Sequence, residues 1–441
     1  MTGISRRDFL RAAAAGAAAL AMPRCTPEPN SQRRANFIIV LADDLGYGDL
    51  GCYGGKDIRT PSLDAMAAAG LRFTDFHSNA PICSPTRAAL LTGRYQQRMG
   101  IDRIVTRSPQ SPKGLPESEI TFAQVLKSAG YATGLVGKWH LGFGETFSPM
   151  SRGFDEFRGF LGGQIDYHSH VDPGGQPDWW AGGKATREQG YLTDLITSHA
   201  VGFIERHRAE PFCLYVAHGA PHAPYQGPND KAEADVGKPG TEFGPRQDRA
   251  AAYVEMVESL DAGVGRVLKA LKDLKLDENT FVFFCSDNGQ AGVGSPGPLR
   301  GRKGMLFEGG IRVPGIAYRP GSIRPGQTTQ AAMTMDLLPT MASLAAAELP
   351  KGVKIDGVDL SPLLLKGADL PARTLFWRHR GGQWAVRKGP WKIWNLRQPW
   401  LFNLADDIGE KKNIASQHGP LLRELVAEYR AWEKTVFPPA G

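Results

Sequence analysis

The sequence contains few cysteines, and their spacing matches no cysteine-based framework. Only five occur in 441 residues, and none belongs to a CxxC pair. This spacing argues against a disulfide scaffold. Cys213 and Cys285 lie in apolar runs, so we expect them to be buried core thiols, whereas Cys83 lies in a different setting, just before a helical pattern.

The main body of the chain also lacks a low-complexity tract, an internal repeat and clusters of basic residues. The chain has 52 lysines and arginines against 45 acidic residues, a formal net charge of +7, but the basic residues form no runs interleaved with aromatics. No nucleic-acid partner is therefore expected. With 41% hydrophobic residues the chain is globular, and its basic surface suits an anionic substrate.

The N-terminal segment lacks an apolar run long enough to span a bilayer, but it has the features of an export signal. Ser5–Leu10 holds paired arginines, and the Ala-rich stretch Ala12–Met22 is shorter than the roughly 20 residues of a transmembrane helix. Ala19–Ala21 is a small-x-small cleavage site. The pattern resembles a bacterial twin-arginine signal, which predicts a periplasmic or secreted protein exported by the twin-arginine machinery. A lipoprotein anchored through Cys25 is the alternative.

Four apolar runs read as buried strands that end in polar, chemically capable residues. The runs are Asn36–Leu41, Ala132–Val136, Pro211–Val216 and Phe281–Cys285, and they lead in turn to Asp43 and Asp44, Lys138 and His140, His218 and His222, and Asp287 and Asn288. Helical patterns lie at 61–69, 86–92, 121–129, 193–208 and 251–274. This alternation predicts an α/β fold with a mostly parallel central sheet flanked by helices, in which ligands bind beyond the carboxyl ends of the strands.

Changes in composition and in hydrophobic pattern divide the chain into four parts. Residues 1–34 are expected to form the export signal and a short linker, and 35–348 the main α/β domain, which carries the polar residues at the strand ends. Residues 349–370, with Pro, Gly and Asp, are expected to be a connector. Residues 371–441 contain short strand-like runs followed by an amphipathic pattern over Leu421–Lys434, which predicts a small C-terminal antiparallel sheet with a helix packed on it.

Two pairs of hard oxygen donors lie at strand tips. Asp43-Asp44 and Asp287-Asn288 offer carboxylate and amide oxygens, which suit calcium or magnesium better than zinc. A single Asp-Asp pair usually lies in a solvent-exposed loop and binds no metal. Because both pairs end buried strands, a shared divalent cation is the stronger interpretation.

The segment around Cys83 carries a family resemblance. Cys83–Arg87 (CSPTR) matches the CxPxR signature of the sulfatase family, and the match continues through Arg94 (CSPTRAALLTGR). The segments IIVLADDLGYGDLG, GKWHLG, APHAPY, SDNG, GRKGMLFEGGIRVP and LFNLADDIGEKKNIA also resemble sulfatase segments and occur in the expected order. The chain thus resembles formylglycine-dependent, arylsulfatase-like sulfatases of the alkaline phosphatase superfamily.

This resemblance implies a fold and a set of roles. The fold would be alkaline-phosphatase-like, and Cys83 would be oxidised to formylglycine by a formylglycine-generating or anaerobic sulfatase-maturing enzyme. The roles implied are one Ca²⁺ held by Asp43, Asp44, Asp287 and Asn288 together with residue 83; Arg87 on the hydrated aldehyde; Lys138 and Lys303 on sulfate oxygens; and His140 and His222 in proton transfer. The hydrate would attack sulfur with one hydroxyl and expel sulfate with the other.

Substrate recognition is the least determined part of the sequence. Asp166, His168, His170, Trp179 and Trp180 lie in a Gly/Pro-rich insert that would either overhang the site and contact a sugar or pack against the C-terminal subdomain. His218 would either support the site or cap a loop.

The leading hypothesis is a sulfatase that acts on a sulfated carbohydrate, a glycosaminoglycan or algal polysaccharide fragment. Two alternatives stay open at this point. One is a phosphonate or phosphate monoester hydrolase of the same superfamily, since that branch can share CxPxR. The other is a glycan-binding pseudo-sulfatase, against which the complete set of catalytic residues argues.

Overall fold

The computed structural model describes residues 34–233, 238 and 243–437. The predicted export signal and Cys25 lie outside these residues. Ala35–Gly441 forms one compact unit. Among the described residues, no helix has both the length and the apolar character needed to cross a membrane.

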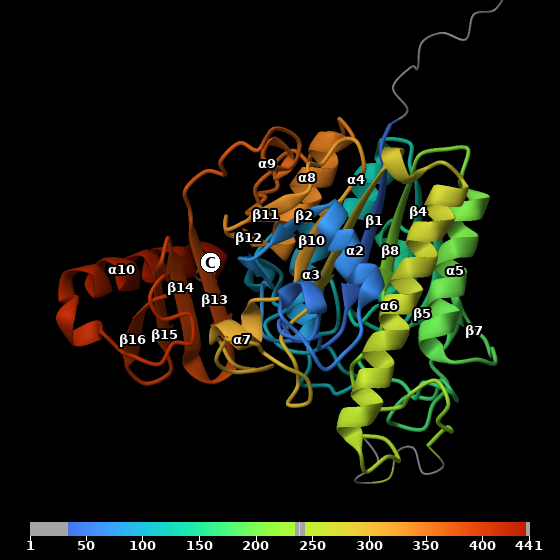
Figure 1. Ribbon diagram of the computed structural model, residues 1–441, viewed down its shortest axis with the longest axis horizontal. Helices are drawn as coiled ribbons and strands as arrows, with labels where there is room; N and C mark the ends of the chain where they lie inside the picture. The colour runs from blue at the N-terminus through green and yellow to red at the C-terminus, as the bar shows by residue number, and fades with distance from the viewer. Residues whose placement is uncertain (1–33, 234–237, 239–242, 438–441) are drawn as a thin grey trace, which may run out of the picture. The chain divides into compact units, whose positions relative to one another are not determined.

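A ten-stranded mixed sheet forms the centre of this unit (Figure 1), in the order β11-β2-β10-β9-β1-β8-β4-β5-β6-β7. The five central strands run parallel: β9 (Thr280–Ser286), β1 (Asn36–Ala42), β8 (Phe212–Ala217), β4 (Ala132–Lys138) and β5 (Glu156–Phe160). The outer strands are β11 (Gly326–Thr328), β2 (Leu71–Phe73), β10 (Gly315–Tyr318), β6 (Trp180–Ala181) and β7 (Lys184–Ala185), while β3 (Phe76–His77) pairs with β12 (Ala332–Met333). The predicted mostly parallel sheet is confirmed.

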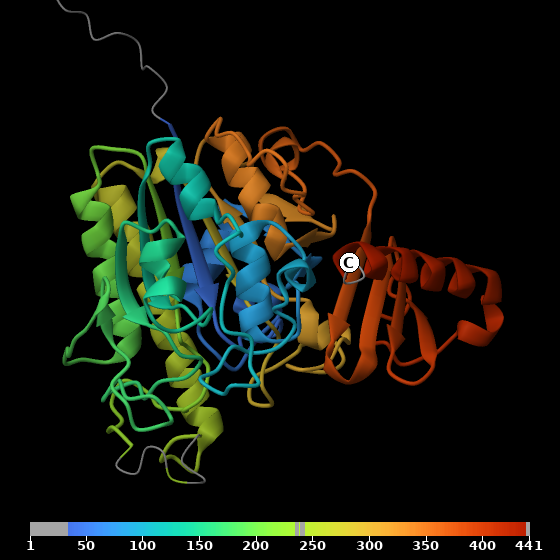
Figure 2. The ribbon, with the colours of Figure 1, turned by 180° about the vertical axis from the view of Figure 1, so that it is seen from behind.

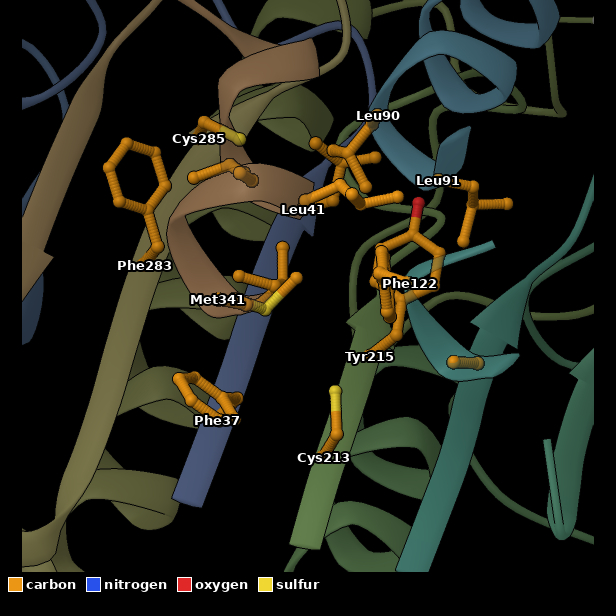
Figure 3. Packing of buried hydrophobic residues seen from close by; sticks show 14 of the residues in the cluster. Phe37, Leu41, Leu90, Leu91, Phe122, Cys213, Tyr215, Phe283, Cys285 and Met341 are labelled. Carbon is orange, nitrogen blue, oxygen red and sulfur yellow. The ribbon is translucent and has the colours of Figure 1, made fainter. Parts of the chain in front are cut away.

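Helices cover both faces of the sheet. One face carries α2 (Pro61–Ala69), α5 (Leu192–Arg206) and α6 (Arg249–Asp273), and the other carries α3 (Cys83–Thr92), α4 (Phe122–Ser128), α8 (Leu337–Leu344) and α9 (Ser361–Lys366); Figures 1 and 2 view opposite sides. Alternate residues of β1 enter opposite cores, with Phe37 and Leu41 on the α3 side, as Figure 3 shows, and Ile38 on the α6 side. Because both faces are buried, the strand is apolar at every position.

Cys213 and Cys285 are fully buried, as expected, and Figure 3 shows both in the core on the α3 side of the sheet. The four described cysteines, which include Cys52 and Cys83, are free thiols.

One local prediction was wrong, and the segment expected to be a connector contains a helix. Helix α3 begins at Cys83 and not at Thr86, because a proline such as Pro85 is tolerated in the first turn, where its missing N–H has no partner to lose. The segment expected to be a connector contains α9, whose Leu363 and Leu364 are buried in the main core.

The C-terminal part forms the expected antiparallel sheet with a helix, at the left of Figure 1. The strands are β13 (Thr374–His379), β14 (Gln383–Lys388), β15 (Trp391–Asn395) and β16 (Pro399–Asn403), and the helix is α10 (Gly419–Val436). Stacked rings join the two layers: Trp384 lies 4.3 Å from Tyr429, and Phe376 lies 5.1 Å from Trp432, between ring centroids.

A buried charge cluster ties this sheet to α7 (Glu308–Ile311). Lys392 Nζ lies 2.8 Å from Glu308 Oε1 and 2.8 Å from Glu410 Oε1, and the Lys392 and Glu308 side chains are fully buried. Although burial opposes ionisation, Lys392 with His77 and Arg387 holds the pKa of Glu308 well below its usual range. The cluster therefore depends on the lysine charge.

We expect Lys392→Met to destabilise the protein by about 3–5 kcal/mol, because removing one partner leaves buried carboxylates uncompensated. Urea unfolding followed by fluorescence would measure the change. Lys388→Met is the matched control on the same sheet, since Lys388 pairs with Glu424 and Glu428 at the surface, where an ion pair contributes little. Equal stability of the two variants would contradict the role given to Lys392.

Candidate active site

The polar residues that follow β1, β9, β8 and β4 meet at one edge of the sheet, because the carboxyl ends of parallel strands share an edge. The backbone N–H of Asp287 donates to Ala42 O at 3.1 Å, and that of Asp43 donates to Ala220 O at 3.0 Å. Asp44 adopts a left-handed backbone, with φ of 66°. Such strain in a residue other than glycine is typical of sites where function fixes the geometry.

Buried acceptor oxygens gather at this edge. Asn288 Nδ2 donates to Asp44 Oδ1 at 2.7 Å, so its amide oxygen points elsewhere. Asn288 Oδ1 and Asp43 Oδ1 are buried and accept no hydrogen bond from any described residue. Asp43, Asp44 and His222 can bring ligand atoms within 4.8 Å of one another. Acceptor oxygens without donors suit a divalent cation.

Three cationic side chains contact the aspartates at this edge. Lys138 Nζ donates to Asp43 Oδ2, Lys303 Nζ lies 2.7 Å from Asp44 Oδ1, and Arg87 Nη2 donates to Asp287 Oδ2 at 2.8 Å. Burial alone would raise the pKa of Asp43, but Lys138 and further cations hold it well below its usual range. Burial is the main cause that raises the pKa of Asp287 to about 7, and the negative charge of Asp43 raises it further. The positive charge of Arg87 acts in the opposite direction.

Cys83 is the first residue of α3, and its side chain lies near the lysines and aspartates at the edge of the central sheet. Its side chain is 2% exposed and lines a cavity together with Lys303, His140 and His222. The Lys303 loop is held against the Cys83 segment by a hydrogen bond of 2.8 Å from Gly304 N to Pro81 O. Burial raises the pKa of the Cys83 thiol, although Lys138 and Lys303 act in the opposite direction.

Two histidines complete the floor of the cavity. His140 has a left-handed φ of 57° and a buried Nδ1 without a hydrogen-bond partner among the described residues. A Cβ on Gly163 would lie 2.5 Å from the His140 ring, so only glycine fits there. His222 Nδ1 lies 2.6 Å from Ala223 O and therefore carries the hydrogen, which turns Nε2 towards Asp44 at 3.7 Å. Burial lowers the pKa of both histidines. The positive charge of Lys138 lowers the pKa of His140 further, and that of Lys303 lowers the pKa of His222 further.

The cavity has a volume of about 690 Å³, and sequence reasoning missed most of its rim. The rim residues come from separate segments: Arg103–Arg107, Phe143, Gly162–Gln164, Asp172–Gly174, and His379 with Arg380 from the β13–β14 hairpin. The Gly162-Gly163 pair after β5 was a sequence signal for close backbone approach. No sequence signal indicated that the hairpin of the C-terminal sheet would reach the cavity.

None of the six residues considered for substrate recognition, which include His218, lines the cavity. Their polar atoms bond to neighbouring segments: Asp166 Oδ1 accepts from Ser169 N at 2.7 Å, His168 Nε2 lies 3.1 Å from Gly227 O, Trp179 Nε1 donates to Glu188 at 2.9 Å, and Trp180 Nε1 donates to Asp178 at 2.7 Å. His170 packs on Trp179, with 5.3 Å between ring centroids. Their Gly/Pro-rich setting suggested an overhanging loop, but the loop folds back on itself and on α5.

The sixth residue, His218, is buried, and its Nδ1 has no hydrogen-bond partner among the described residues. Burial lowers the pKa of His218 to about 3, against about 6.5 in an unfolded chain. Below pH 6.5 His218 binds a proton in the unfolded state but stays neutral in the folded state. The folded state is therefore favoured fully above pH 6.5, and the free energy of unfolding decreases as the pH falls below that value.

We therefore expect His218→Gln to reduce the loss of stability on acidification by up to about 1.4 kcal/mol per pH unit between pH 6.5 and 4. Urea unfolding at pH 7, 6 and 5 measures this slope for both proteins. Parallel slopes would show that His218 accepts a proton within the fold.

A second group of potential ligands, Asp75, His77 and Glu308, does not resemble a metal site. Cationic side chains already neutralise its carboxylates, with Arg387 2.8 Å from Asp75 and Lys392 2.8 Å from Glu308. This group belongs to the buried charge cluster that holds the C-terminal sheet.

At the carboxyl edge of this α/β sheet, lysine, arginine and histidine side chains surround the buried Cys83. Such an arrangement is typical of hydrolases that act on anionic esters. Comparisons with known proteins agree. Residues 35–347 match the Sulfatase family model, and residues 3–23 match the model of the twin-arginine translocation signal sequence, so the chain carries the expected export signal.

Several sulfatases are similar to this chain. Arylsulfatase A of Bos taurus is 37% identical over 86% of this chain and 83% of its own length, and N-acetylgalactosamine-6-sulfatase of Sus scrofa is 38% identical over 83% and 73%. The crystal structure of Ps i-CgsB aligns with a TM-score of 0.83 and 32% identity over 92% and 94% of the two chains, and that protein was also solved with k-i-k-neocarrahexaose. The chain belongs to the sulfatase family and is a sulfuric ester hydrolase.

Proposed function

We propose that this protein hydrolyses sulfate esters of a carbohydrate, with a formylglycine derived from Cys83 and one calcium ion. The observation that carries the proposal is the convergence of Cys83, Lys303 and two histidines on one cavity, beside buried oxygen donors and the buried Lys138, which contacts Asp43. An anionic tetrahedral ester needs this combination of positive charge, nucleophile and proton carriers.

Calcium would be held by Asp43, Asp44, Asp287 and Asn288, together with residue 83. The donor set supports this assignment, because it consists of hard oxygens and includes two buried acceptors without donors. Bound there, calcium supplies positive charge for sulfate oxygens and lowers the pKa of a hydroxyl group. Arg87 orients the site by fixing Asp287, and its Nη1 donates to Lys138 O at 3.2 Å.

An unmodified Cys83 would be a poor nucleophile, since burial keeps its thiol protonated. Formylglycine supplies, once hydrated, one hydroxyl that attacks sulfur and a second whose deprotonation releases sulfate. Arg87 would hold this hydrate, and Lys138 and Lys303 would bind sulfate oxygens. His222 Nε2 would protonate the departing alcohol, and the unpartnered nitrogen of neutral His140 would accept the proton of the second hydroxyl.

Maturation would precede folding. Cys83 is 2% exposed, so a formylglycine-generating or anaerobic sulfatase-maturing enzyme could reach it only in an unfolded chain. The twin-arginine machinery exports folded proteins. Oxidation would therefore take place before export, and the mature enzyme would work in the periplasm or outside the cell.

The mass of the tryptic peptide Phe73–Arg87, from protein made in its natural host, tests the proposal. We expect part or all of Cys83 to carry an aldehyde. A thiol throughout would contradict it. Kinetics on an aryl sulfate, a phosphate monoester and a phosphonate test the reaction class, and dominant phosphonate cleavage would favour the related hydrolase.

The role of His222 predicts a dependence on the leaving group. We expect His222→Gln to lower kcat/KM by about 10²–10⁴ for an alkyl or sugar sulfate, but far less for 4-nitrophenyl sulfate, whose leaving oxygen needs no proton. A series of aryl sulfates with leaving groups of different pKa measures the effect. His199→Gln serves as the control, since His199 pairs with Glu188 outside the cavity. An equal loss on every substrate would contradict the role of general acid.

A further inference from the structure

Three arginines lie around the opening of the catalytic cavity. Arg103 and Arg107 come from the segment after α3, and Arg380 comes from the hairpin of the C-terminal sheet. We propose that the substrate carries a second anionic group, a sulfate or a carboxylate, and that these arginines bind it while Lys303 and Lys138 bind the sulfate that is cleaved. This inference rests on the proposed function and specifies its substrate.

The three guanidinium groups are not used to hold the fold together. Arg103 has its nearest carboxylate, Asp102, at 3.9 Å, and Arg107 has Asp172 at 3.6 Å, with side chains 61% and 53% exposed. Among the described residues, the Arg380 guanidinium has no acidic side chain within 4.0 Å and no hydrogen-bond partner. Their donors are therefore available to a ligand.

Arginines with structural roles in this protein look different. Arg98 lies 2.7 Å from Asp356, and Arg387 lies 2.8 Å from Asp75, in both cases with side chains 10% exposed or less. Such short, buried pairs satisfy the guanidinium within the fold. The contrast indicates that the rim arginines serve a function outside the fold's own stability.

One rim arginine is oriented before any ligand binds. The Arg107 guanidinium lies over the Phe143 ring, 4.1 Å from its centroid. Stacking on an aromatic ring fixes the plane of the guanidinium and leaves its edge free for two parallel hydrogen bonds. Sulfate and carboxylate both accept such a pair of bonds.

The charge balance of the cavity favours a ligand with more than one negative group. Its lining contains Lys303 and the three arginines but one carboxylate, Asp172. Its volume of about 690 Å³ exceeds the need of a lone sulfate and lies in the range that holds a drug-sized molecule.

Competition against 4-nitrophenyl sulfate hydrolysis tests this inference in calcium-loaded, matured enzyme. The competitors are inorganic sulfate, a sulfated dextran tetrasaccharide with sulfates at many ring positions, and tetragalacturonate with carboxylates alone. In Arg103→Gln and Arg380→Gln we expect Ki for at least one oligosaccharide to rise about tenfold. Ki for inorganic sulfate should change little, and the difference should shrink at high ionic strength.

Arg397→Gln is the matched control, because Arg397 is exposed in the turn between β15 and β16 and lies outside the cavity lining. Rim-dependent competition by the sulfated tetrasaccharide assigns the second group as sulfate, and rim-dependent competition by tetragalacturonate assigns it as carboxylate. If neither Ki responds to the rim variants, the inference is wrong while the proposed function stands. Failure of the unaltered protein to cleave 4-nitrophenyl sulfate contradicts the proposed function itself.

Discussion

Cys83→Ala is expected to lower kcat for 4-nitrophenyl sulfate by at least about 10⁴-fold, the scale of losing a catalytic nucleophile. Alanine offers no side chain that could be oxidised to an aldehyde, so neither the attack on sulfur nor the release of sulfate can proceed. The effect should appear in kcat, since the cations that bind sulfate remain. Steady-state kinetics with matured protein measures it.

The substitution should leave the fold and the binding of substrate intact. Cys213→Ala is the matched control, because Cys213 is equally buried but lies in β8 away from the cavity. It should cost some stability through the small void left in the core, without loss of kcat. If Cys83→Ala kept its turnover and its glycan binding, hydrolysis would not depend on this side chain. The proposed role of Cys83 as the source of the nucleophile would then be wrong.

Removal of the divalent cation should abolish hydrolysis nearly as completely. We expect chelation to reduce kcat/KM by about 10²–10⁴-fold, because several kcal/mol of charge stabilisation are lost in the transition state. The two apolar cores on either side of the sheet contain none of the proposed calcium ligands. Circular dichroism should therefore remain native, with a lower Tm from the lost binding energy.

Addition of calcium after chelation should restore activity, and zinc should not, because the donor set consists of oxygens. Asp43→Asn is the companion variant, since it keeps the shape but removes charge from one proposed ligand. It should raise the calcium concentration needed for half-maximal activity. Full activity in metal-free protein, verified by elemental analysis, would contradict the metal assignment.

The central sheet could be predicted from the sequence because burial on both faces makes its strands continuously apolar. Strand β1 was expected over 36–41 and spans Asn36–Ala42, and the predicted helix over 61–69 coincides with α2. Local pattern could not locate α9. The helix has six residues, with Pro362 in its first turn and Gly367 at its C-cap, which is too short for a periodic apolar pattern, and packing of Leu363 and Leu364 in the core stabilises it.

The floor of the site could be predicted for the same reason as the sheet. Once parallel strands were expected, the residues after them, such as Asp43 and Asp287, had to share an edge. The rim could not be predicted, because it is assembled by loops that are distant in sequence. Trp179 illustrates the limit: its aromatic character suggested a sugar contact, yet it is 1% exposed and packs beside α5.

A crystal structure of protein matured in its natural host, grown with calcium and measured for anomalous scattering, tests the central claim most directly. The account predicts an aldehyde or its hydrate at position 83 and one calcium ion bound by Asp43, Asp44, Asp287 and Asn288 next to it. An unoxidised Cys83 with no ion at these oxygens, or calcium bound at Asp75 and Glu308 instead, would contradict it.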